Sequence, residues 1–236
     1  APPPTVEPRA DALSRIGAAA DARTDELDAG RRLPDDLHLE AARAGLYRQL
    51  VPRSMGGPGL APLEWFRNGV ALAHHDASLA WVVTQGAAEL AWIAVGGDDE
   101  WARDLLSDPL ATSASSSAGL GTLTVDGASS RIAGRWAFNT GSPAAAWIGG
   151  MALVDGAADA AGRPVIRWAW VPADRAEVLD DWDPTGLRGT GSHSTVIPTQ
   201  EIPTAWTFSP HDPTGNDRGP HRVLVGNGWQ AVTKSS

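Results

Sequence analysis

The sequence contains no cysteine among its 236 residues. Disulfide bonds, thiolate catalysis and cysteine-ligated metal centres are therefore excluded. It also has no basic run: its 28 acidic residues outnumber 19 lysines and arginines, and the formal net charge is -9. This dispersed acidic charge argues against a nucleic-acid partner.

Long apolar runs and targeting segments are missing as well. No apolar run reaches the roughly 18 residues of a membrane span. The first residues, APPPTVEPRA, lack the charged and apolar regions of a signal peptide. We therefore expect no membrane partner. Together with the absence of cysteine, these features favour the cytoplasm.

Motifs for metal binding and for hydrolysis are not found. None of the six histidines stands in an HExxH or a two-His-plus-carboxylate spacing. His74 and His75 are adjacent, so on a helix their side chains point about 100° apart and cannot readily share one metal. No GxSxG elbow is present, and the glycine-rich segments 119–121 and 186–191 do not lie between a strand and a helix. We expect no metal site.

Tryptophan is the aromatic residue that the chain does have in quantity. Eleven Trp stand against one Tyr and three Phe. The indole combines a large apolar face with a single N–H donor. Such residues suit a protein that stacks on aromatic ligands, although filling a core is the simpler explanation for any one of them.

The first hundred residues read as helices. Apolar residues recur at helical spacing, prolines stand where helices can begin, and glycines stand where they can end. These signals predict five helices: from Glu7 to about Gly30, from Pro34 to Gly45, from Pro62 to about His74, from an Asp76 cap through ASLAWVVTQGAAELAWIAVG, and from Asp98 to Leu106. The segment after Asp76 is apolar nearly all round, which predicts a helix inside a domain.

After Pro109 the pattern changes to short alternating runs separated by turn signals. TLTVDG, SRIAGRWAF, VIRWAWVP and STVIPTQEIP are examples, and they predict an antiparallel barrel or sandwich. The expected fold class is therefore α+β. We expect an all-α domain at 7–108, an antiparallel β domain at 109–206 and a loop-like tail at 207–236.

Three segments could carry a ligand site, and each also has a structural explanation. GRWAFNTGSPAAAW is either a packed strand end or a platform for a flat ring with polar edges. The serine run ATSASSSAGLG is either a flexible loop or a place where backbone and hydroxyls approach a ligand closely. DDWDPTGLRGTGSHSTV is either a tight turn with Arg188 on the surface or part of the same site.

The joint order of these segments resembles that of a known family. ARAGLYRQLVPRSMGGPGLAPLEW and HHDASLAWV come first, and then GRWAFNTG, Trp147, WDPTGLRGTGSH and Ile202-Pro203 follow. In this order the chain resembles the acyl-CoA dehydrogenase superfamily, and within it the flavin-dependent two-component monooxygenases that hydroxylate aromatic and steroid substrates. The segment WDPTGLRGTGS is similar to the monooxygenase branch in particular.

The resemblance implies a flavin site and five residues for it. Phe138 matches an aromatic position that packs on the isoalloxazine ring. Thr140 matches a hydroxyl near the reactive ring nitrogen, and Trp81 matches an aromatic residue of the helical domain close to the flavin. Ser113 and Ser115 fall in the loop that borders flavin and substrate. A flat apolar wall with hydrogen bonds at its edge is what a flavin needs.

Two features depart from the family's pattern. Glu89 lies where related hydroxylases often place a histidine that handles the substrate, so we assign it to the substrate side together with Ser115. The family also has a C-terminal helical bundle that supplies a catalytic base and the oligomer core. We expect that bundle to be absent from this chain, and we therefore assign no catalytic residue.

The expected function is that of a flavin-dependent oxidoreductase using FAD or FMN. The favoured reaction is monooxygenation of a small aromatic or polycyclic molecule with reduced flavin from a separate flavin reductase. An acyl-CoA dehydrogenase that oxidises a thioester with FAD is the alternative. A truncated, non-catalytic subunit that binds a ligand or a partner is the third. The expected partner chain is a second copy in a homo-oligomer or a full-length chain.

Overall fold

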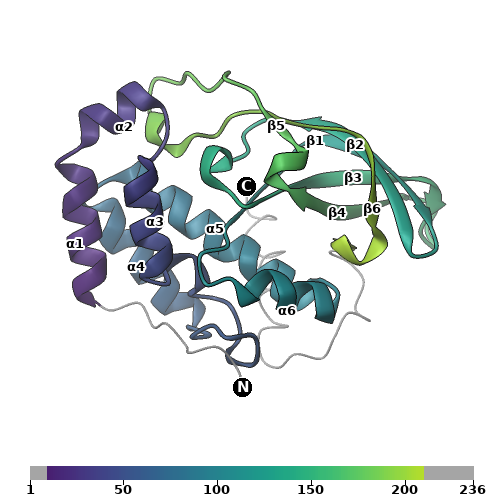
Figure 1. Ribbon diagram of the computed structural model, residues 1–236, viewed down its shortest axis with the longest axis horizontal. Helices are drawn as coiled ribbons and strands as arrows, with labels where there is room; N and C mark the ends of the chain where they lie inside the picture. Colours follow the sequence, from purple (N-terminus) through teal and green to yellow (C-terminus); the bar gives the residue numbers. More distant parts are fainter. Residues whose placement is uncertain (1–9, 210–236) are drawn as a thin grey trace.

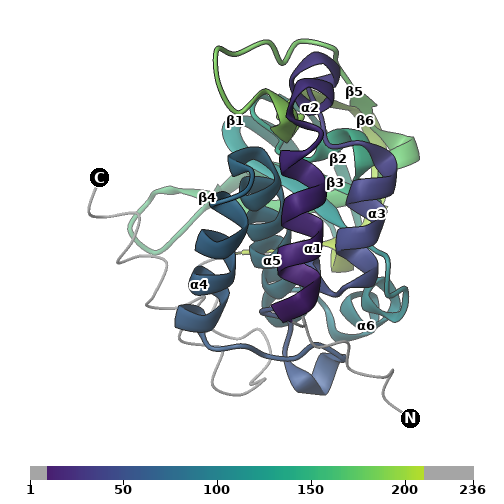
Figure 2. The same ribbon diagram turned by 90° about the vertical axis from the view of Figure 1, so that its left-hand side faces the viewer.

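The computed structural model describes residues 10–209, in which all α-helices precede the strands. The helices within this range are α1 (Ala10–Asp21), α2 (Thr24–Gly30), α3 (Asp35–Arg43), α4 (Pro62–Ala73), α5 (Ala77–Gly96) and α6 (Asp99–Ser107). Figure 1 shows them gathered at one side of the sheet, and Figure 2 shows α1, α3, α4 and α5 as a bundle. The predicted order of a helical part followed by a β part is confirmed.

Helix starts follow the capping signals in the sequence. The Asp76 side chain accepts a hydrogen bond of 2.6 Å from the backbone N–H of Leu79, which caps α5 as predicted. Asp98 accepts from the backbone N–H of Glu100 and caps α6 in the same way. Pro62 opens α4, where its missing N–H is no loss.

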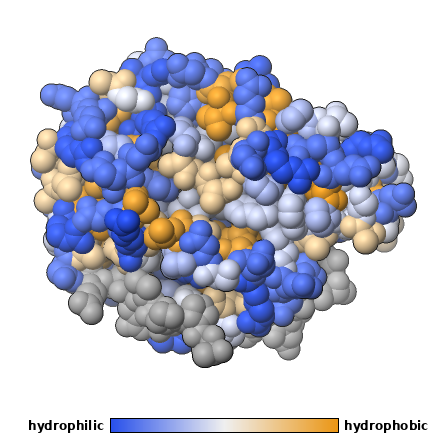
Figure 3. All heavy atoms as spheres, viewed as in Figure 1, coloured by the Kyte–Doolittle hydropathy of each residue, from blue (hydrophilic) through white to orange (hydrophobic). Residues whose placement is uncertain are grey.

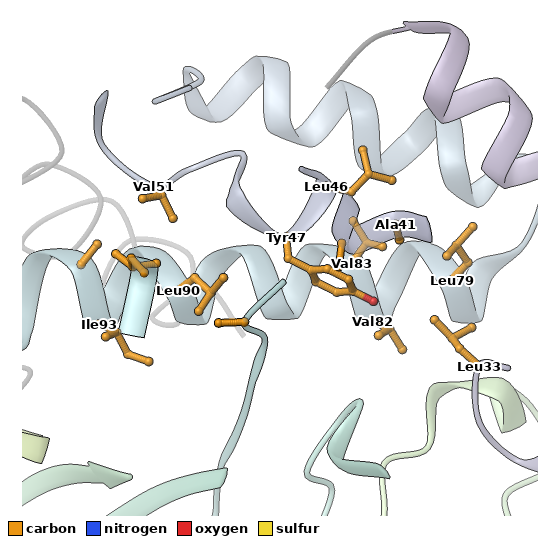
Figure 4. Close-up of a cluster of buried hydrophobic side chains, with 14 of the residues drawn as sticks. Leu33, Ala41, Leu46, Tyr47, Val51, Leu79, Val82, Val83, Leu90 and Ile93 are labelled. Atoms are coloured by element: carbon orange, nitrogen blue, oxygen red, sulfur yellow. The ribbon is translucent and has the colours of Figure 1, made fainter. Parts of the chain in front are cut away.

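Helix α5 is the core helix of the molecule. Its buried residues cover most of its circumference, and Figure 4 shows Leu79, Val82, Val83, Leu90 and Ile93 among the packed side chains of this core. The sequence predicts no apolar run of membrane-spanning length, yet α5 has the length and hydropathy of a span. Burial of 72% of its apolar window inside the protein is what a core helix shows.

The β part is a mixed sheet of seven strands. The strands within the described residues are β1 (Ser113–Asp126), β2 (Ser129–Trp136), β3 (Trp147–Ala158), β4 (Pro164–Pro172), β5 (Glu177–Val178), β6 (Thr195–Pro203) and β7 (Thr207–Phe208), in the order β5-β6-β2-β1-β3-β4-β7. The fold class is confirmed with one correction. Strands β1 and β3 pair in parallel, whereas the sequence predicts an antiparallel β domain.

The parallel pair follows from the connection between β2 and β3. Strand β2 returns beside β1 as a hairpin, so it ends next to the beginning of β1. Residues 137–146 then cross the start of β1, and β3 runs along its other edge with Trp147 opposite Ser113. This crossover contains the NTGSP segment. β7 lies in the range predicted as a loop-like tail, and the rest of that tail, 210–236, lies outside the described residues.

Tryptophans join the helices to the sheet. Trp92 of α5 lies 5.2 Å from Trp168 of β4 between ring centroids, and Trp101 of α6 lies 5.9 Å from Trp170 of β4. Filling the core therefore explains most of these residues. Trp81 is different, because 46% of it is exposed. The face of the molecule in Figure 3 is largely hydrophilic, with small separate apolar patches.

Candidate functional site

Two of the predicted site residues of the β part, Phe138 and Thr140, lie in the crossover between β2 and β3. Asn139 is wholly buried and holds this crossover. Its amide donates to the Gly149 carbonyl at 3.3 Å and to Thr195 Oγ1 at 2.9 Å. Its backbone N–H donates to the His193 carbonyl at 3.0 Å. These bonds fix the position of Thr140, the next residue.

Phe138 is an exposed aromatic residue in a strained conformation. Its φ is +57°, in the left-handed region, which costs about 1–2 kcal/mol for a residue with a Cβ. Its side chain is 63% exposed, and its ring meets that of Trp182 edge-on at 6.0 Å. Strain of this kind gathers at functional sites. The fold therefore presents a phenyl face to solvent at a backbone position that phenylalanine does not favour.

Trp81 and Thr140 are brought together from the two parts of the chain. The indole Nε1–H of Trp81 donates to Thr140 Oγ1 at 3.3 Å. A row of hydroxyls continues from there, with Thr140 Oγ1 2.9 Å from Ser192 Oγ and Ser192 Oγ 2.7 Å from Thr190 Oγ1. The Thr190 hydroxyl donates to the Leu187 carbonyl at 2.9 Å. The sequence predicts two members of this row and misses Thr190 and Ser192.

Glu89, Ser113 and Ser115 form the second group of predicted residues. Burial raises the pKa of Glu89 to about 8, and hydrogen bonds from the Ser115 N–H and from the two serine hydroxyls oppose the shift without cancelling it. The carboxyl is thus largely protonated at neutral pH. Its Oε2 atom is buried with no partner in the protein. Ser113 also accepts a hydrogen bond of 3.0 Å from the indole of Trp170.

The serines belong to a strand and not to a loop as predicted. β1 begins at Ser113, and Ser113–Ser116 pair with Trp147–Gly150 of β3. Ser113 and Ser116 are buried and Ser115 is half-buried. Small side chains allow α5 to pack closely on the start of β1. The small side chains of this run therefore serve the contact between a helix and a strand, and the predicted close approach to a ligand stays a prediction.

One face of α5 connects the two groups. Trp81, Gln85, Glu89 and Trp92 follow one another at spacings of four, four and three residues, which places them on one side of a helix. Trp81 contacts Thr140, Glu89 faces the start of β1, and Trp92 packs on Trp168. Along the axis Trp81 and Glu89 are about 12 Å apart. Half-buried Gln85 lies between them, and this same spacing could have found it in the sequence.

The segment 180–194 is tied to the helices by two arginines. Arg31 Nη2 donates to Asp180 at 2.5 Å, and its Nη1 donates to the Trp182 carbonyl at 3.0 Å. Arg188 Nε donates to the Asp28 carbonyl at 3.0 Å and its Nη1 to Asp183 at 2.5 Å. Arg188 is thus a structural clamp. Through it the segment that carries Thr190 and Ser192 is held against α2.

Comparison with known proteins identifies a group of homologues. No family model matches the chain. Over 189 residues it is 30% identical to the indole-3-acetate monooxygenase of Pseudomonas putida, covering 79% of this chain and 47% of that protein. It is 29% identical over 189 residues to the oxygenase subunit HsaA, a flavin-dependent monooxygenase of Rhodococcus jostii, covering 77% of this chain and 47% of that protein.

A solved structure shows the same fold. XiaF from a Streptomyces species, determined in complex with FADH2 and glycerol, superimposes with a TM-score of 0.75 at 26% identity, over 84% of this chain and 50% of that one. The chain spans about half the length of the curated relatives it matches. It is homologous to the oxygenase components of flavin-dependent monooxygenases and has their acyl-CoA dehydrogenase-like fold, which confirms the resemblance seen in the sequence.

The residues present fit a flavin ring. Trp81 and Phe138 have exposed aromatic rings, and the hydroxyl of half-buried Thr140 accepts the hydrogen bond that joins the helical and β parts beside them. The carboxyl of Glu89, whose Oε2 atom has no hydrogen-bond partner in the protein, lies farther along the same helix face. Flat apolar walls with a few placed polar groups are typical of small-molecule sites.

Proposed function

We propose that the chain binds a reduced flavin, FMN or FAD, along the sheet-facing side of α5, as part of a flavin-dependent monooxygenase. The contact between Trp81 and Thr140 carries this proposal. It joins the helical and β parts through one hydrogen bond while leaving the Trp81 indole 46% exposed and Phe138 63% exposed. Two uncovered aromatic rings beside a fixed hydroxyl contrast with the seven tryptophans of the described residues that lie in or against the hydrophobic core.

Each site residue has a role in this proposal. Trp81 and Phe138 form the apolar walls against which the ring packs. The Thr140 hydroxyl meets the ring edge, and Ser113 and Ser115 border the ring on the side of the substrate. No catalytic residue is assigned.

Glu89 defines the substrate side of the site. In its protonated form it adds no charge, so the site suits an uncharged aromatic or polycyclic molecule better than an anion. When bound, reduced flavin supplies the two electrons with which molecular oxygen is divided between substrate and water. The chain's residues hold the reactants in place.

The proposal includes the surroundings of the reaction. A separate flavin reductase supplies the reduced flavin, which is supported by the similarity to an oxygenase subunit, HsaA. The reaction takes place in the cytoplasm, where reduced pyridine nucleotides sustain such a reductase. Assembly with a second copy or with a longer chain is part of the same proposal.

An anaerobic titration of the chain with reduced and oxidised FMN and FAD tests the proposal. Absorbance and tryptophan fluorescence report binding. We expect reduced flavin to bind, and Phe138→Ala to weaken binding at least tenfold, the loss of about one aromatic contact. Phe66→Ala is the matched control, because Phe66 of α4 is 61% exposed and is not among the proposed site residues. If neither flavin binds in either redox state, the proposal is wrong. Reduction of bound FAD by an acyl-CoA would favour the dehydrogenase instead.

A further inference from the structure

The hydroxyl row at the site has a fixed donor at one end and a fixed acceptor at the other. The indole of Trp81 can only donate, and it donates to Thr140 Oγ1 at 3.3 Å. The Leu187 carbonyl can only accept, and it accepts from Thr190 Oγ1 at 2.9 Å. Between them lie the contacts of 2.9 Å from Thr140 to Ser192 and 2.7 Å from Ser192 to Thr190.

Counting protons along this row sets the direction of every bond. Each hydroxyl has one proton and two acceptor lone pairs. The proton of Thr190 is used on the Leu187 carbonyl, so Ser192 must donate to Thr190. The proton of Ser192 is then used, so Thr140 must donate to Ser192. Reversing any one bond would leave two lone pairs facing each other at less than 3 Å.

Thr140 is therefore left with one free acceptor position and no free donor. One lone pair of its oxygen receives the indole proton of Trp81, and its own proton is directed at Ser192. Donating into a chain of hydrogen bonds also polarises the Thr140 oxygen and makes it a better acceptor. Ser192 and Thr190 are 5% and 1% exposed, so water does not compete for these bonds.

We propose that this row makes the site selective for the redox state of the flavin, favouring reduced over oxidised flavin by presenting Thr140 as a hydrogen-bond acceptor. The inference rests on the proposed function, in which the Thr140 hydroxyl meets the ring edge, and it takes the reactive ring nitrogen to be the edge atom at Thr140, as the family resemblance implies. In reduced flavin that nitrogen carries a hydrogen and donates. In oxidised flavin it has only a lone pair, so it would meet the lone pair of Thr140. Thr190 and Ser192 are positioning residues, because they act on the ring through Thr140.

A matched pair of variants at Thr190 tests the selectivity. Thr190→Val keeps the side chain's shape but removes the hydroxyl, while Thr190→Ser keeps the hydroxyl. Without a hydroxyl at residue 190 the proton of Ser192 is released, the row can reverse, and Thr140 can donate to the ring. The Leu187 carbonyl stays satisfied, because the backbone N–H of residue 190 and the indole of Trp182 also donate to it.

The readouts are the dissociation constants of reduced and oxidised flavin, measured anaerobically, and the midpoint potential of the bound flavin. We expect Thr190→Val to lower the preference for reduced flavin on the order of tenfold, the effect of one hydrogen bond. A tenfold change lowers the potential by about 30 mV for a two-electron couple. Thr190→Ser should keep the wild-type ratio, and Ser192→Ala should lose the preference as Thr190→Val does.

The outcomes separate this inference from the proposed function. If the wild type binds flavin and the ratio of the two constants is the same in all variants, the selectivity of the row is refuted while flavin binding stands. If the wild type binds neither form, the proposed function and this inference fall together. A Thr190→Ser variant that loses the preference as Thr190→Val does would also refute the inference, because a hydroxyl would then not be the cause. Thermal unfolding of each variant confirms that it is folded.

Discussion

Replacing Glu89 by glutamine is expected to remove a large pH dependence from the stability of this protein. Glutamine has nearly the same size and carries no charge at any pH. The native carboxyl is 6% exposed, and burial raises its pKa from 4.5 to about 8. Between these two values the native protein keeps a proton that the unfolded chain has released. The wild type therefore loses stability as pH rises through this interval.

The expected slope follows from the size of the shift. Each pH unit in the interval lowers the free energy of unfolding of the wild type by up to about 1.4 kcal/mol relative to Glu89→Gln. Over the whole interval the difference reaches at most about 5 kcal/mol, which is comparable with the total stability of a typical domain. Above pH 8 the native carboxyl also ionises, and the difference in free energy of unfolding between the wild type and Glu89→Gln no longer changes with pH. No charged group is among the causes of the shift, so salt should change it little.

Urea denaturation at pH 5, 6, 7, 8 and 9 measures this slope. The slope is the readout, because an amide in place of the carboxyl changes the stability by an amount that does not depend on pH. Glu177→Gln is the matched control, since Glu177 is an exposed glutamate of β5. Its curve should run parallel to that of the wild type. If Glu89→Gln also runs parallel to the wild type between pH 5 and 8, the native carboxyl is ionised and the assignment of a neutral Glu89 is refuted.

Three further substitutions test how the site is built. Gly150→Ala should destabilise the fold by about 1–3 kcal/mol in urea denaturation, because the added Cβ would overlap the buried Trp136 ring. Asn139→Ala should cost about 1–3 kcal/mol and weaken flavin binding, since it removes the bonds that fix Thr140; unchanged binding would show that the crossover is held otherwise. Phe138→Gly should leave the free energy of unfolding within about 1 kcal/mol of the wild type. Glycine relieves the strain of the positive φ, and this gain offsets the greater freedom of glycine in the unfolded chain. Flavin titration of the same variant should show weaker binding.

Local signals in the sequence were sufficient to predict most helices but not the sheet topology. The single helix predicted from Glu7 to about Gly30 was wrong, because the chain turns after Asp21 and forms two helices, α1 and α2. The Asp76 cap and the apolar composition of the next 20 residues fix α5 within a single segment. The parallel pairing of β1 with β3 depends on residues 137–146, which cross the start of β1. The residue pattern within the two strands does not indicate this crossing. Alternation along a strand predicts which face is buried, but it does not identify the neighbouring strand.

The site was predicted in part, and through the order of its motifs. Thr190 and Ser192 meet Thr140 across about fifty positions of sequence, so no periodic pattern could connect them. A flexible loop was one of two interpretations of the serine run, and the family resemblance also implied a loop. The strand pairing of the run comes from contact with β3, which overrides the loop propensity of small polar residues. Helical spacing alone, in contrast, would have placed Gln85 beside the predicted residues.

The placement of Glu89 connects stability and function in this fold. It is the one charged residue in the 20 residues of α5, and most of the other positions of that helix are buried in the core. An ionisable group buried with an unpartnered oxygen lowers the stability of the native state, so packing gives no reason for it. The position of Glu89 on the helix face that also carries Trp81 gives a functional reason. A neutral carboxyl there can face an uncharged substrate where the ring is proposed to lie. The pH profile of stability and that of substrate binding should then break at the same pH, about 8, because one proton governs both.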